Sequence, residues 1–233
     1  MKSAPIPKNE KERLISLHKL GLLNTKPEER FDRITRIATK VFNVPISTLT
    51  LVDEKREWFK SVCGLDQKEG DRAISFCGHA LLVNDVLVIS DTKKDKRFFD
   101  NPMVVGKPYI RFYAGVPIMN ADGQRIGVFC IKDTKPRQFS KSNEEILKNL
   151  ALWAELEINL RNLSLALSKE RKMQTQIVKQ VGCSPPADVG GKLSEAVEQA
   201  NKEGYIVTQI ITTLLYEGGR PYELALLCTP YQR

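Results

Sequence analysis

The sequence predicts an α+β protein in which an antiparallel sheet is flanked by helices. Residues 46–52 alternate apolar and polar side chains, as a half-buried strand does, and 58–62 can form the return strand of a hairpin. A second hairpin is expected from 109–119 and 124–132, joined by Ala121-Asp122-Gly123, because Asp-Gly accepts a positive φ. The short helices expected between the hairpins do not alternate regularly with strands, which argues against a parallel doubly wound sheet.

The composition is that of an ordinary globular protein. The chain has 233 residues, of which 42% are hydrophobic and 27% charged, and no apolar run reaches the ~20 residues of a membrane span. Residues 1–21 lack the apolar core of a signal peptide. We therefore expect a cytoplasmic protein with no membrane insertion.

The net charge of +8 lies entirely in the first part of the chain. Residues 1–139 contain 25 Lys and Arg against 17 Asp and Glu, whereas residues 140–233 contain 11 of each. The charge is spread thinly, without the basic stripe of a nucleic-acid-binding protein, so no nucleic-acid partner is expected. Five scattered cysteines without a CxxC pair, together with only two histidines, predict neither a metal site nor another cofactor.

The helices of the first part follow from capping and periodicity. Residues 8–22 are expected to form an amphipathic helix within an N-terminal segment, 1–24. A second helix is expected from Thr25, which has capping-box spacing to Glu28, to a stop at Pro45.

Shorter elements are expected between the two hairpins. Ser75 can cap a helix over 76–83, and 86–90 reads as a strand. Residues 95–101 read as a helical turn stopped by Pro102.

From Ser142 onward, apolar residues recur at alternating steps of four and three. This spacing predicts a long helix over 140–181 with a coiled-coil-like seam. The seam comprises Ile146, Leu150, Trp153, Leu156 or Glu157, Leu160, Leu163 and Leu167. The stripe can either pack on the protein's own sheet or pair with a second copy, and we expect a homodimer in which the later turns pair.

The last part of the chain is expected to be a small αββ unit over 192–233. A linker at 182–191, rich in glycine and proline, separates it from the long helix. A helix at 193–203 is followed by strands at 205–216 and 221–229. A unit of this size buries little surface alone, so we expect it to dock on the first domain or to pair with the same unit of a second copy.

Residues 74–115 are the candidate ligand-binding stretch, because varied polar side chains are interleaved there with aromatics. That composition suits a small-molecule pocket, although a polar loop between strands is the plainer alternative. The candidate ligand-binding residues, which include one tryptophan from the first hairpin, are Trp58, Phe76, Cys77, His79, Asp91, Arg97, Phe99, Asn101, Arg111 and Tyr113.

Several of these residues have an equally good structural explanation. Arg111 could clamp an anionic group, or pair with Asp91 or Asp100. His79 could respond to pH, and Cys77, near the start of a helix, could have a lowered pKa, but both could also be packed core groups. The aromatic residues could be core, and Asp91 and Asn101 could hold the loop through backbone bonds.

Residues 9–160 resemble a GAF domain of the bacterial signalling type, the type that precedes diguanylate cyclases and histidine kinases. The matching segments are ERLISLHKLGLLNTKPEERFDRITRIA, VPISTLTLVDEKREWFKSVCGL, ISFCGHALL, VISDTKKDKRFFDNPMV and IRFYAGVPIMNADGQRIGVFCIKDTKPRQFS. The resemblance implies a GAF-like domain over 25–139, with a ligand pocket closed by 75–113. It also implies a dimeric sensor that signals through the exiting helix. No signature of the usual output domain follows that helix.

We therefore predict a sensory and regulatory protein that is not an enzyme and has no catalytic residues. It would bind an unknown small molecule or a signalling protein, and transmit the signal through a dimeric helix. One alternative is a free methionine-R-sulfoxide reductase, in which Cys77 would attack and Cys63 or Cys130 would resolve. The other is a ligand-free platform for dimerisation or docking.

Overall fold

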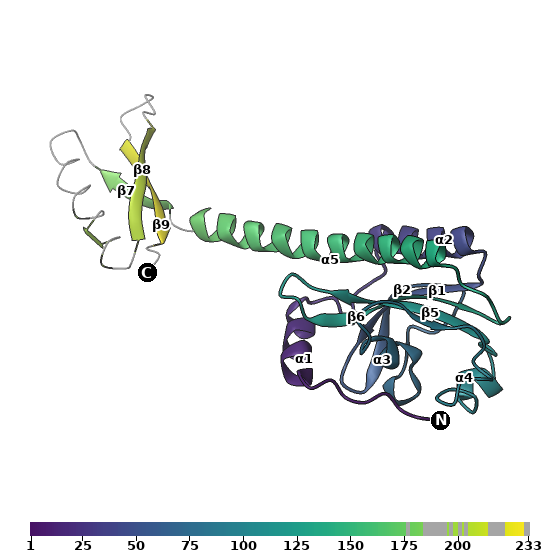
Figure 1. The fold of residues 1–233 in the computed structure, drawn as a ribbon. Coiled ribbons are helices and arrows are strands. Elements are labelled where there is room, and N and C mark those ends of the chain that lie inside the picture. Colours follow the sequence, from purple (N-terminus) through teal and green to yellow (C-terminus); the bar gives the residue numbers. More distant parts are fainter. Residues whose placement is uncertain are drawn as a thin grey trace. The chain divides into compact units, whose positions relative to one another are not determined.

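A computed structural model describes residues 1–175, 178–183, 195, 198–199, 202, 205–213 and 222–230. Side chains are described up to residue 160 and at 195, 198–199 and 202. The chain forms two compact units, 1–162 and 163–233 (Figure 1). None of the described helices combines the length and the apolar character needed to span a membrane.

The first unit is built on a six-stranded antiparallel sheet with the order β3-β2-β1-β6-β5-β4. This confirms the predicted α+β class. The strands are β1 (Ile46–Val52), β2 (Arg56–Cys63), β3 (Glu69–Asp71), β4 (Leu87–Ile89), β5 (Phe112–Met119) and β6 (Arg125–Asp133). Both predicted hairpins are present, and Gly123 has a φ of 73° in the turn between β5 and β6.

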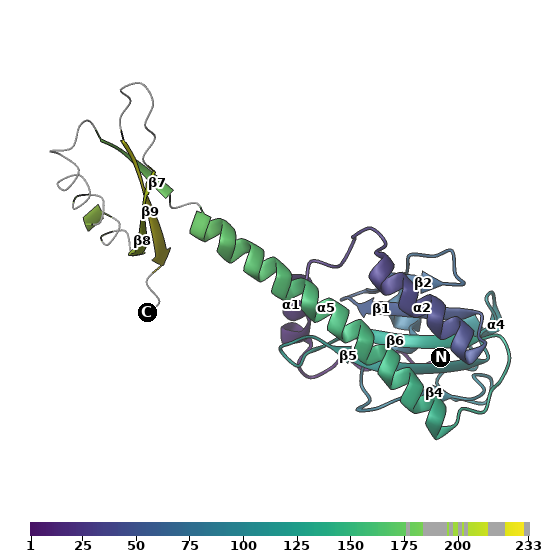
Figure 2. The ribbon, with the colours of Figure 1, turned by 90° about the horizontal axis from the view of Figure 1, so that it is seen from above.

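Helices cover both faces of this sheet. Figures 1 and 2 show α2 (Glu29–Phe42) and α5 (Lys141–Thr175) lying side by side on one face. The opposite face is covered by the short helix α3 (Phe76–Ala80), and α4 (Pro102–Val105) lies on the same side in Figure 1. We call these the α2/α5 face and the α3 face.

Strand alternation divides the core into two layers. On β6, Phe129 and Ile131 belong to the core cluster with α2 and α5, whereas Val128 and Cys130 belong to the cluster with α3. Successive side chains of a strand point to opposite faces, so the two clusters are the two faces of one sheet.

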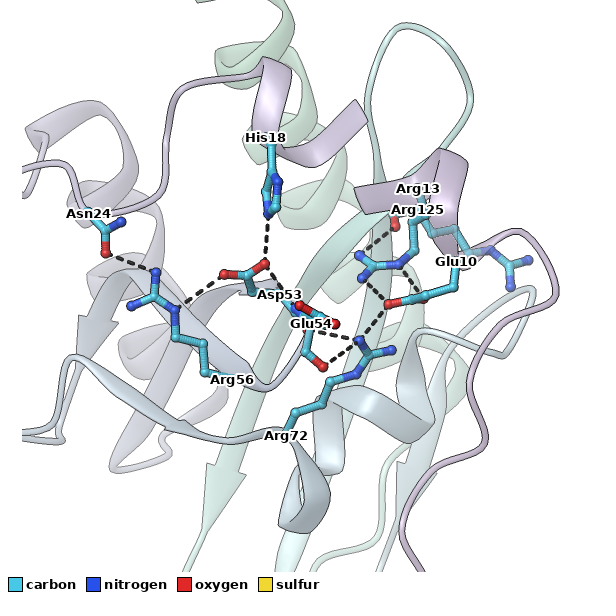
Figure 3. Close-up of polar contacts among 9 residues, drawn as sticks. All are labelled: Glu10, Arg13, His18, Asn24, Asp53, Glu54, Arg56, Arg72 and Arg125. Atoms are coloured by element: carbon cyan, nitrogen blue, oxygen red, sulfur yellow. Dashed lines mark hydrogen bonds and ion pairs between the residues drawn. The ribbon is translucent and has the colours of Figure 1, made fainter. Parts of the chain in front are cut away.

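The helix α1 (Glu10–Lys19) is anchored by a buried ion-pair network, drawn in Figure 3. The Glu10 carboxylate accepts hydrogen bonds from Arg13 at 2.8 Å and from Arg72 at 2.5 Å. Arg72 also donates to the carbonyls of Asp53 and Glu54, in the turn between β1 and β2. The network therefore joins the N-terminal helix to the first hairpin.

The expected ends of α2 are wrong. The helix begins at Glu29, and the Thr25 hydroxyl donates to the Leu22 carbonyl at 2.7 Å instead of capping the helix. It ends at Phe42 because Asn43 adopts the left-handed conformation with a φ of 48°, before Pro45 is reached.

The region around Pro102 agrees with the expectation and adds one element to it. The Phe98 and Phe99 N–H groups donate to the Asp95 carbonyl at 3.0 Å, as in the expected helical turn, which ends before Pro102. Pro102 is also the first residue of α4, a position that suits proline. Asn101 caps the helix by accepting from the Met103 N–H at 2.8 Å. Ser75 caps α3, as predicted, by accepting from the Gly78 N–H at 3.0 Å.

The early turns of α5 use a different stripe from the predicted seam. The residues that pack on the α2/α5 face are Leu147, Leu150, Ala151, Ala154 and Ile158. Of the seam residues, Leu150 and Trp153 join this core, whereas Ile146, Leu156 and Leu160 are exposed. The side chains of Leu163 and Leu167 lie outside the described residues, and the coiled-coil pairing remains a prediction.

The second unit contains a three-stranded antiparallel sheet with the order β7-β9-β8. Its strands are β7 (Val178–Cys183), β8 (Tyr205–Thr213) and β9 (Tyr222–Pro230). The expectation that the helix continues to 181 is wrong, since α5 ends at Thr175. The β-branched Val178 and Val181, which also fit a helical repeat, instead pair with β9.

Parts of the expected αββ unit fall outside the described residues. Within the expected linker, 182–183 belong to β7 and 184–191 are not described. The expected helix at 193–203 is described only as isolated helical positions at 195, 198–199 and 202. Of the two expected strands, 205–213 and 222–229 are described as strand, and the turn between them is not described.

Candidate functional site

The α3 face of the sheet carries a buried cluster of polar and thiol side chains. Four of them, two from β1 and one each from β5 and β6, are Thr48, Thr50, Tyr113 and Cys130, and all are 0% exposed. The cluster also contains two buried charged residues, Glu57 of β2 and Lys132 of β6. The helix α3 covers the cluster with Phe76 and Cys77. This arrangement is unusual for a core, where polar groups cost free energy unless they are bonded.

The sulfur atoms of Cys77 and Cys130 lie 3.8 Å apart at the centre of the cluster. The Tyr113 hydroxyl donates to the Cys77 sulfur at 3.5 Å. The Thr48 hydroxyl lies 3.1 Å from the Cys130 sulfur and 2.8 Å from the Thr50 hydroxyl. A chain of polar contacts therefore runs from β1 through both thiols to β5.

The two charged residues have different surroundings. The Glu57 carboxylate accepts a hydrogen bond from the Ser75 hydroxyl, at the start of α3. No ion pair between Lys132 and a carboxylate is found among the described residues, and the Lys132 ammonium lies 5.4 Å from the centre of the Phe59 ring. Lys132 is a buried cation on the α3 face, close enough to Cys130, Cys77 and Glu57 for their charges to act on it.

The charges set the protonation of the two thiols. Burial alone would raise the pKa of Cys130, but the Cys77 thiol, Lys132 and Thr48 outweigh it and lower the pKa to about 7. Burial and the neighbouring Cys130 raise the pKa of Cys77. Burial alone would lower the pKa of Lys132, but the two cysteines and Glu57 raise it, so the ammonium stays charged. One proton thus leaves the thiol pair far more easily than the second.

Four of the predicted site residues come together on the α3 face: Phe76, Cys77, His79 and Tyr113. The Phe76 ring stacks between those of Phe98 and Tyr113, with centroid distances of 4.4 and 5.2 Å. The His79 ring meets Phe98 edge-on at 4.8 Å. These contacts fill the space over the cluster with packed rings.

His79 also ties down the start of the chain. Its Nε2 atom lies 2.9 Å from the Lys2 carbonyl, and the Lys2 N–H donates to the Arg97 carbonyl at 3.1 Å. Burial is the main cause that lowers the pKa of His79, and it outweighs the hydrogen bond to Lys2. The N-terminal segment thus crosses the outer side of α3.

The other predicted site residues lie elsewhere. Trp58 packs with the core of the α2/α5 face, and the Phe99 ring is 52% exposed. Arg97 pairs with Asp95 at 2.6 Å. The Asp91 carboxylate accepts from the Lys93 N–H within its own turn.

The remaining predicted residues bond to backbone groups. Arg111 donates to the carbonyls of Val104 and Ile110 at 2.8 and 3.0 Å, and so pairs with neither of its expected carboxylates. The fully buried Asn101 caps α4 and donates to the Ile74 carbonyl at 2.7 Å. Both side chains hold the loop over 90–111.

Sequence reasoning missed Glu57, Lys132, Thr48 and Thr50 as members of the cluster. Strand alternation holds the signal, because Lys132 lies two residues after Cys130 and therefore on the same face. Cys63, one of the two cysteines considered as partners for Cys77, lies 3.8 Å from Thr39 of α2, on the other face. Cys130 is thus the cysteine that the fold places beside Cys77.

A separate surface hollow of about 460 Å³ lies beside β4. It is lined by residues 88–91, 94–95 and 136–138. The Arg137 N–H donates to the Ser90 carbonyl at 3.0 Å across it. Of the predicted site residues, only Asp91 contributes to this hollow.

The segment of the chain that matches a known family lies within the first unit. The family model described as "GAF domain" matches residues 26–158. Over 137 residues, 59% of this chain, the sequence is 40% identical to a cyclic di-GMP phosphodiesterase of Pseudomonas aeruginosa. The chain spans 23% of the length of that relative.

Two solved structures resemble the chain at lower identity. The GAF domain of PixJ from Thermosynechococcus elongatus is 11% identical, with a TM-score of 0.49, covering 72% of this chain and 98% of its own. Free methionine-R-sulfoxide reductase from Neisseria meningitidis is 17% identical, with a TM-score of 0.48. The match covers 70% of this chain and 99% of the reductase chain. The sequence predicted a protein that is not an enzyme. The Pseudomonas relative, which is named as an enzyme, contradicts that prediction.

Proposed function

Because the chain belongs to the GAF domain family, we propose that it is a sensory domain that regulates a bacterial signalling enzyme. In this proposal the domain binds a small molecule on the α3 face and signals through α5. The relative named as a cyclic di-GMP phosphodiesterase supports cyclic dinucleotide turnover as the regulated output. The matched segment is only 23% of that relative, and we assign the regulatory role to the part that the two chains share.

The observation that carries the ligand proposal is the buried ammonium of Lys132. A buried cation is costly unless anionic groups surround it, and Glu57, the one carboxylate among the described groups that act on Lys132, is hydrogen-bonded to Ser75. An anionic group of a small molecule would supply a further partner at that position. The proposed ligand is therefore a small molecule with at least one anionic group, bound between β6 and α3.

Native mass spectrometry of the purified protein tests this proposal. We expect a non-covalent mass on the wild-type protein that is lost in Lys132→Met, which keeps the volume and removes the charge. Lys60→Met is the matched control, because Lys60 is also buried but lies on the α2/α5 face, against Glu28. A retained mass that survives in Lys132→Met, or no retained mass together with no stabilisation by a panel of anionic metabolites, would contradict the ligand site.

The proposed route for the signal is a homodimer formed through α5. Leu152, Leu156 and Leu160 are spaced four apart on this helix, and their exposed fractions are 52%, 52% and 60%. Residues at this spacing share one helix face, and that face is turned away from the sheet. Exposed apolar stripes of this kind favour association with a partner helix.

Light scattering after gel filtration tests the dimer. The double variant Leu152→Glu, Leu156→Glu should be monomeric at concentrations where the wild type is a dimer. The control is Val105→Glu, which changes an equally exposed apolar residue on α4, away from the stripe. A wild-type monomer well above micromolar concentration would rule out this route.

A second candidate is a docking platform without a ligand. It is favoured by the packing of the α3 face, where Phe76, Cys77 and Tyr113 are each at most 1% exposed. This candidate predicts a dimer that retains no small molecule. Lys132→Met should then change only the stability of the protein. The same two experiments therefore separate it from the ligand sensor.

A further inference from the structure

The thiols of Cys77 and Cys130 form a contact pair that the ligand proposal leaves unused. Both side chains are 0% exposed, and their sulfur atoms are 3.8 Å apart. Cys130 lies on the central strand β6, whereas Cys77 lies on α3, which covers the site. A disulfide has a sulfur–sulfur distance of about 2.05 Å, so the atoms need approach by less than about 2 Å.

The polar and charged groups around the pair favour a thiolate at Cys130. The Cys130 sulfur is next to the Thr48 hydroxyl at 3.1 Å and shares its face with the Lys132 ammonium, which favours the thiolate. The Cys77 sulfur accepts a hydrogen bond from Tyr113 at 3.5 Å and keeps its proton more firmly. The two cysteines therefore differ in role, with Cys130 as the nucleophile and Cys77 as its partner.

We propose that Cys77 and Cys130 are a redox modification site, at which a hydroperoxide converts the two thiols into a reversible intramolecular disulfide. The Cys130 thiolate attacks the terminal oxygen of the hydroperoxide, breaking the O–O bond and giving a sulfenic acid. The leaving alkoxide or hydroxide takes up a proton. The Cys77 sulfur then attacks the sulfenic sulfur, and the displaced hydroxide takes the Cys77 proton to form water.

The electrons balance across these two steps. The two sulfurs together lose two electrons, and the hydroperoxide is reduced to an alcohol or water with release of one further water. A dithiol reductant reverses the reaction by thiol–disulfide exchange. Methionine sulfoxide is not needed, so the proposal stands apart from the reductase hypothesis and from the proposed anionic ligand.

The disulfide would fix the cover of the candidate site to the sheet. The helix α3 is otherwise held to β2 through Ser75 and Glu57, and to the N-terminal segment through His79 and Lys2. Closing the sulfur–sulfur gap moves α3 toward β6 and joins two positions 53 residues apart in the chain. A further consequence, which rests on the proposed function, is that oxidation would change the access of a ligand to Lys132.

The test treats the full chain in its native state with hydrogen peroxide, followed by denaturation, alkylation of free thiols and peptide mapping. We expect a peptide in which Cys77 and Cys130 are linked. Its mass should be about 2 Da lower than the sum of the two reduced peptides, and dithiothreitol should restore the two thiols. The matched control is Cys63→Ser, which removes the cysteine beside Thr39 on the other face and should leave the linkage unchanged. In Cys77→Ser, a sulfenic acid should accumulate at Cys130 and be trapped by dimedone.

A variant that leaves both thiols in place keeps the proposal testable even if the serine variants do not fold. Lys132→Met should slow the linkage several-fold at neutral pH and move the midpoint of its pH dependence upward from about 7, because the thiolate loses its cation. No linked peptide from the native wild-type protein would overturn the proposal. So would a linkage that forms only after unfolding, or a rate and a pH midpoint that are unchanged in Lys132→Met.

Discussion

The Ser75 hydroxyl donates a hydrogen bond to the buried carboxylate of Glu57, and the same oxygen accepts the Gly78 N–H at 3.0 Å. One side chain thus starts the helix α3 and also satisfies an acid on β2. The contact fixes the position of the helix that carries Cys77 and His79. The candidate site consequently depends on a serine that would contact no ligand.

We predict that Ser75→Ala destabilises the protein by about 2–3 kcal/mol, because it removes a helix cap and leaves a buried carboxylate without its donor. The free energy of unfolding in urea measures this loss. Asp71→Ala is the control, since Asp71 also caps a turn, by accepting from the Ala73 N–H at 2.8 Å, but is exposed. Equal losses in the two variants would mean that the contact with Glu57 contributes nothing.

The Glu10 network should make stability depend on acid pH. Burial alone would raise the pKa of Glu10, but hydrogen bonds from Arg13 and Arg72 outweigh it and lower the pKa below 4.5. A lowered carboxyl pKa contributes stability that is present above pH 4.5 and is lost as the pH falls below it. Glu10→Gln should cost about 3 kcal/mol at pH 7, because Arg13 is left buried without its carboxylate.

Urea unfolding of the wild type and of Glu10→Gln at pH 7 and pH 3 measures this effect. The difference between the two proteins should shrink at the lower pH, because the unfolded wild type binds a proton at Glu10 there more readily than the folded wild type does. Glu29→Gln serves as the control, because Glu29 pairs with Arg36 on the exposed surface of α2 and should have little effect. A difference that is the same at both pH values would contradict the assignment.

Some of these features could be predicted from the sequence and others could not. The hairpins, the Ser75 cap and the α+β class follow from local patterns of a few residues. The cluster on the α3 face does not, because Glu57 and Lys132 come from strands far apart in the chain. A charged residue in a strand is ordinarily expected to face solvent. Strand alternation places Lys132 on the face of Cys130, but only the folded sheet, with its order β2-β1-β6, shows that Glu57 and Lys132 are both buried there.

The error at the end of α5 has a related cause. Apolar residues at 177–178 and 181 fit both a helical repeat and a strand, and local periodicity cannot separate the two. Residues 178–183 form a strand because they pair with β9, which begins more than 40 residues later in the chain. Heptad spacing likewise does not say which stripe of the helix the sheet will cover, and Leu147, Ala151 and Ala154, which lie outside the predicted seam, pack on it.

His79 should make stability fall as the pH drops below neutral. Its pKa is lowered from 6.5, mainly by burial, with the Arg97 charge adding to this and the Lys2 carbonyl and the Asp95 charge opposing it. Because the unfolded chain binds the proton more tightly, stability is full above pH 6.5 and declines as the pH falls below it.

The variant His79→Gln should remove this part of the pH dependence, since glutamine keeps an N–H donor for the Lys2 carbonyl and does not titrate. Urea unfolding at several pH values between 8 and 5 is the measurement. The control is His18→Gln, because His18 pairs with Asp53 but its side chain is 56% exposed. The prediction fails if both histidine variants retain the wild-type slope of the free energy of unfolding against pH.

Arg111 and Lys132 give opposite expectations for the same pair of measurements. The Arg111 guanidinium donates to the carbonyls of Val104 and Ile110, so Arg111→Met should destabilise the protein by about 1–3 kcal/mol through unpaired carbonyls. It should leave any retained ligand mass in native mass spectrometry intact. Lys132→Met should instead remove the retained mass, because the proposed anionic group loses its cation. If Arg111→Met removes that mass while Lys132→Met keeps it, the ligand is held by Arg111, one of the candidate residues of the stretch 74–115, and Lys132 is not its partner.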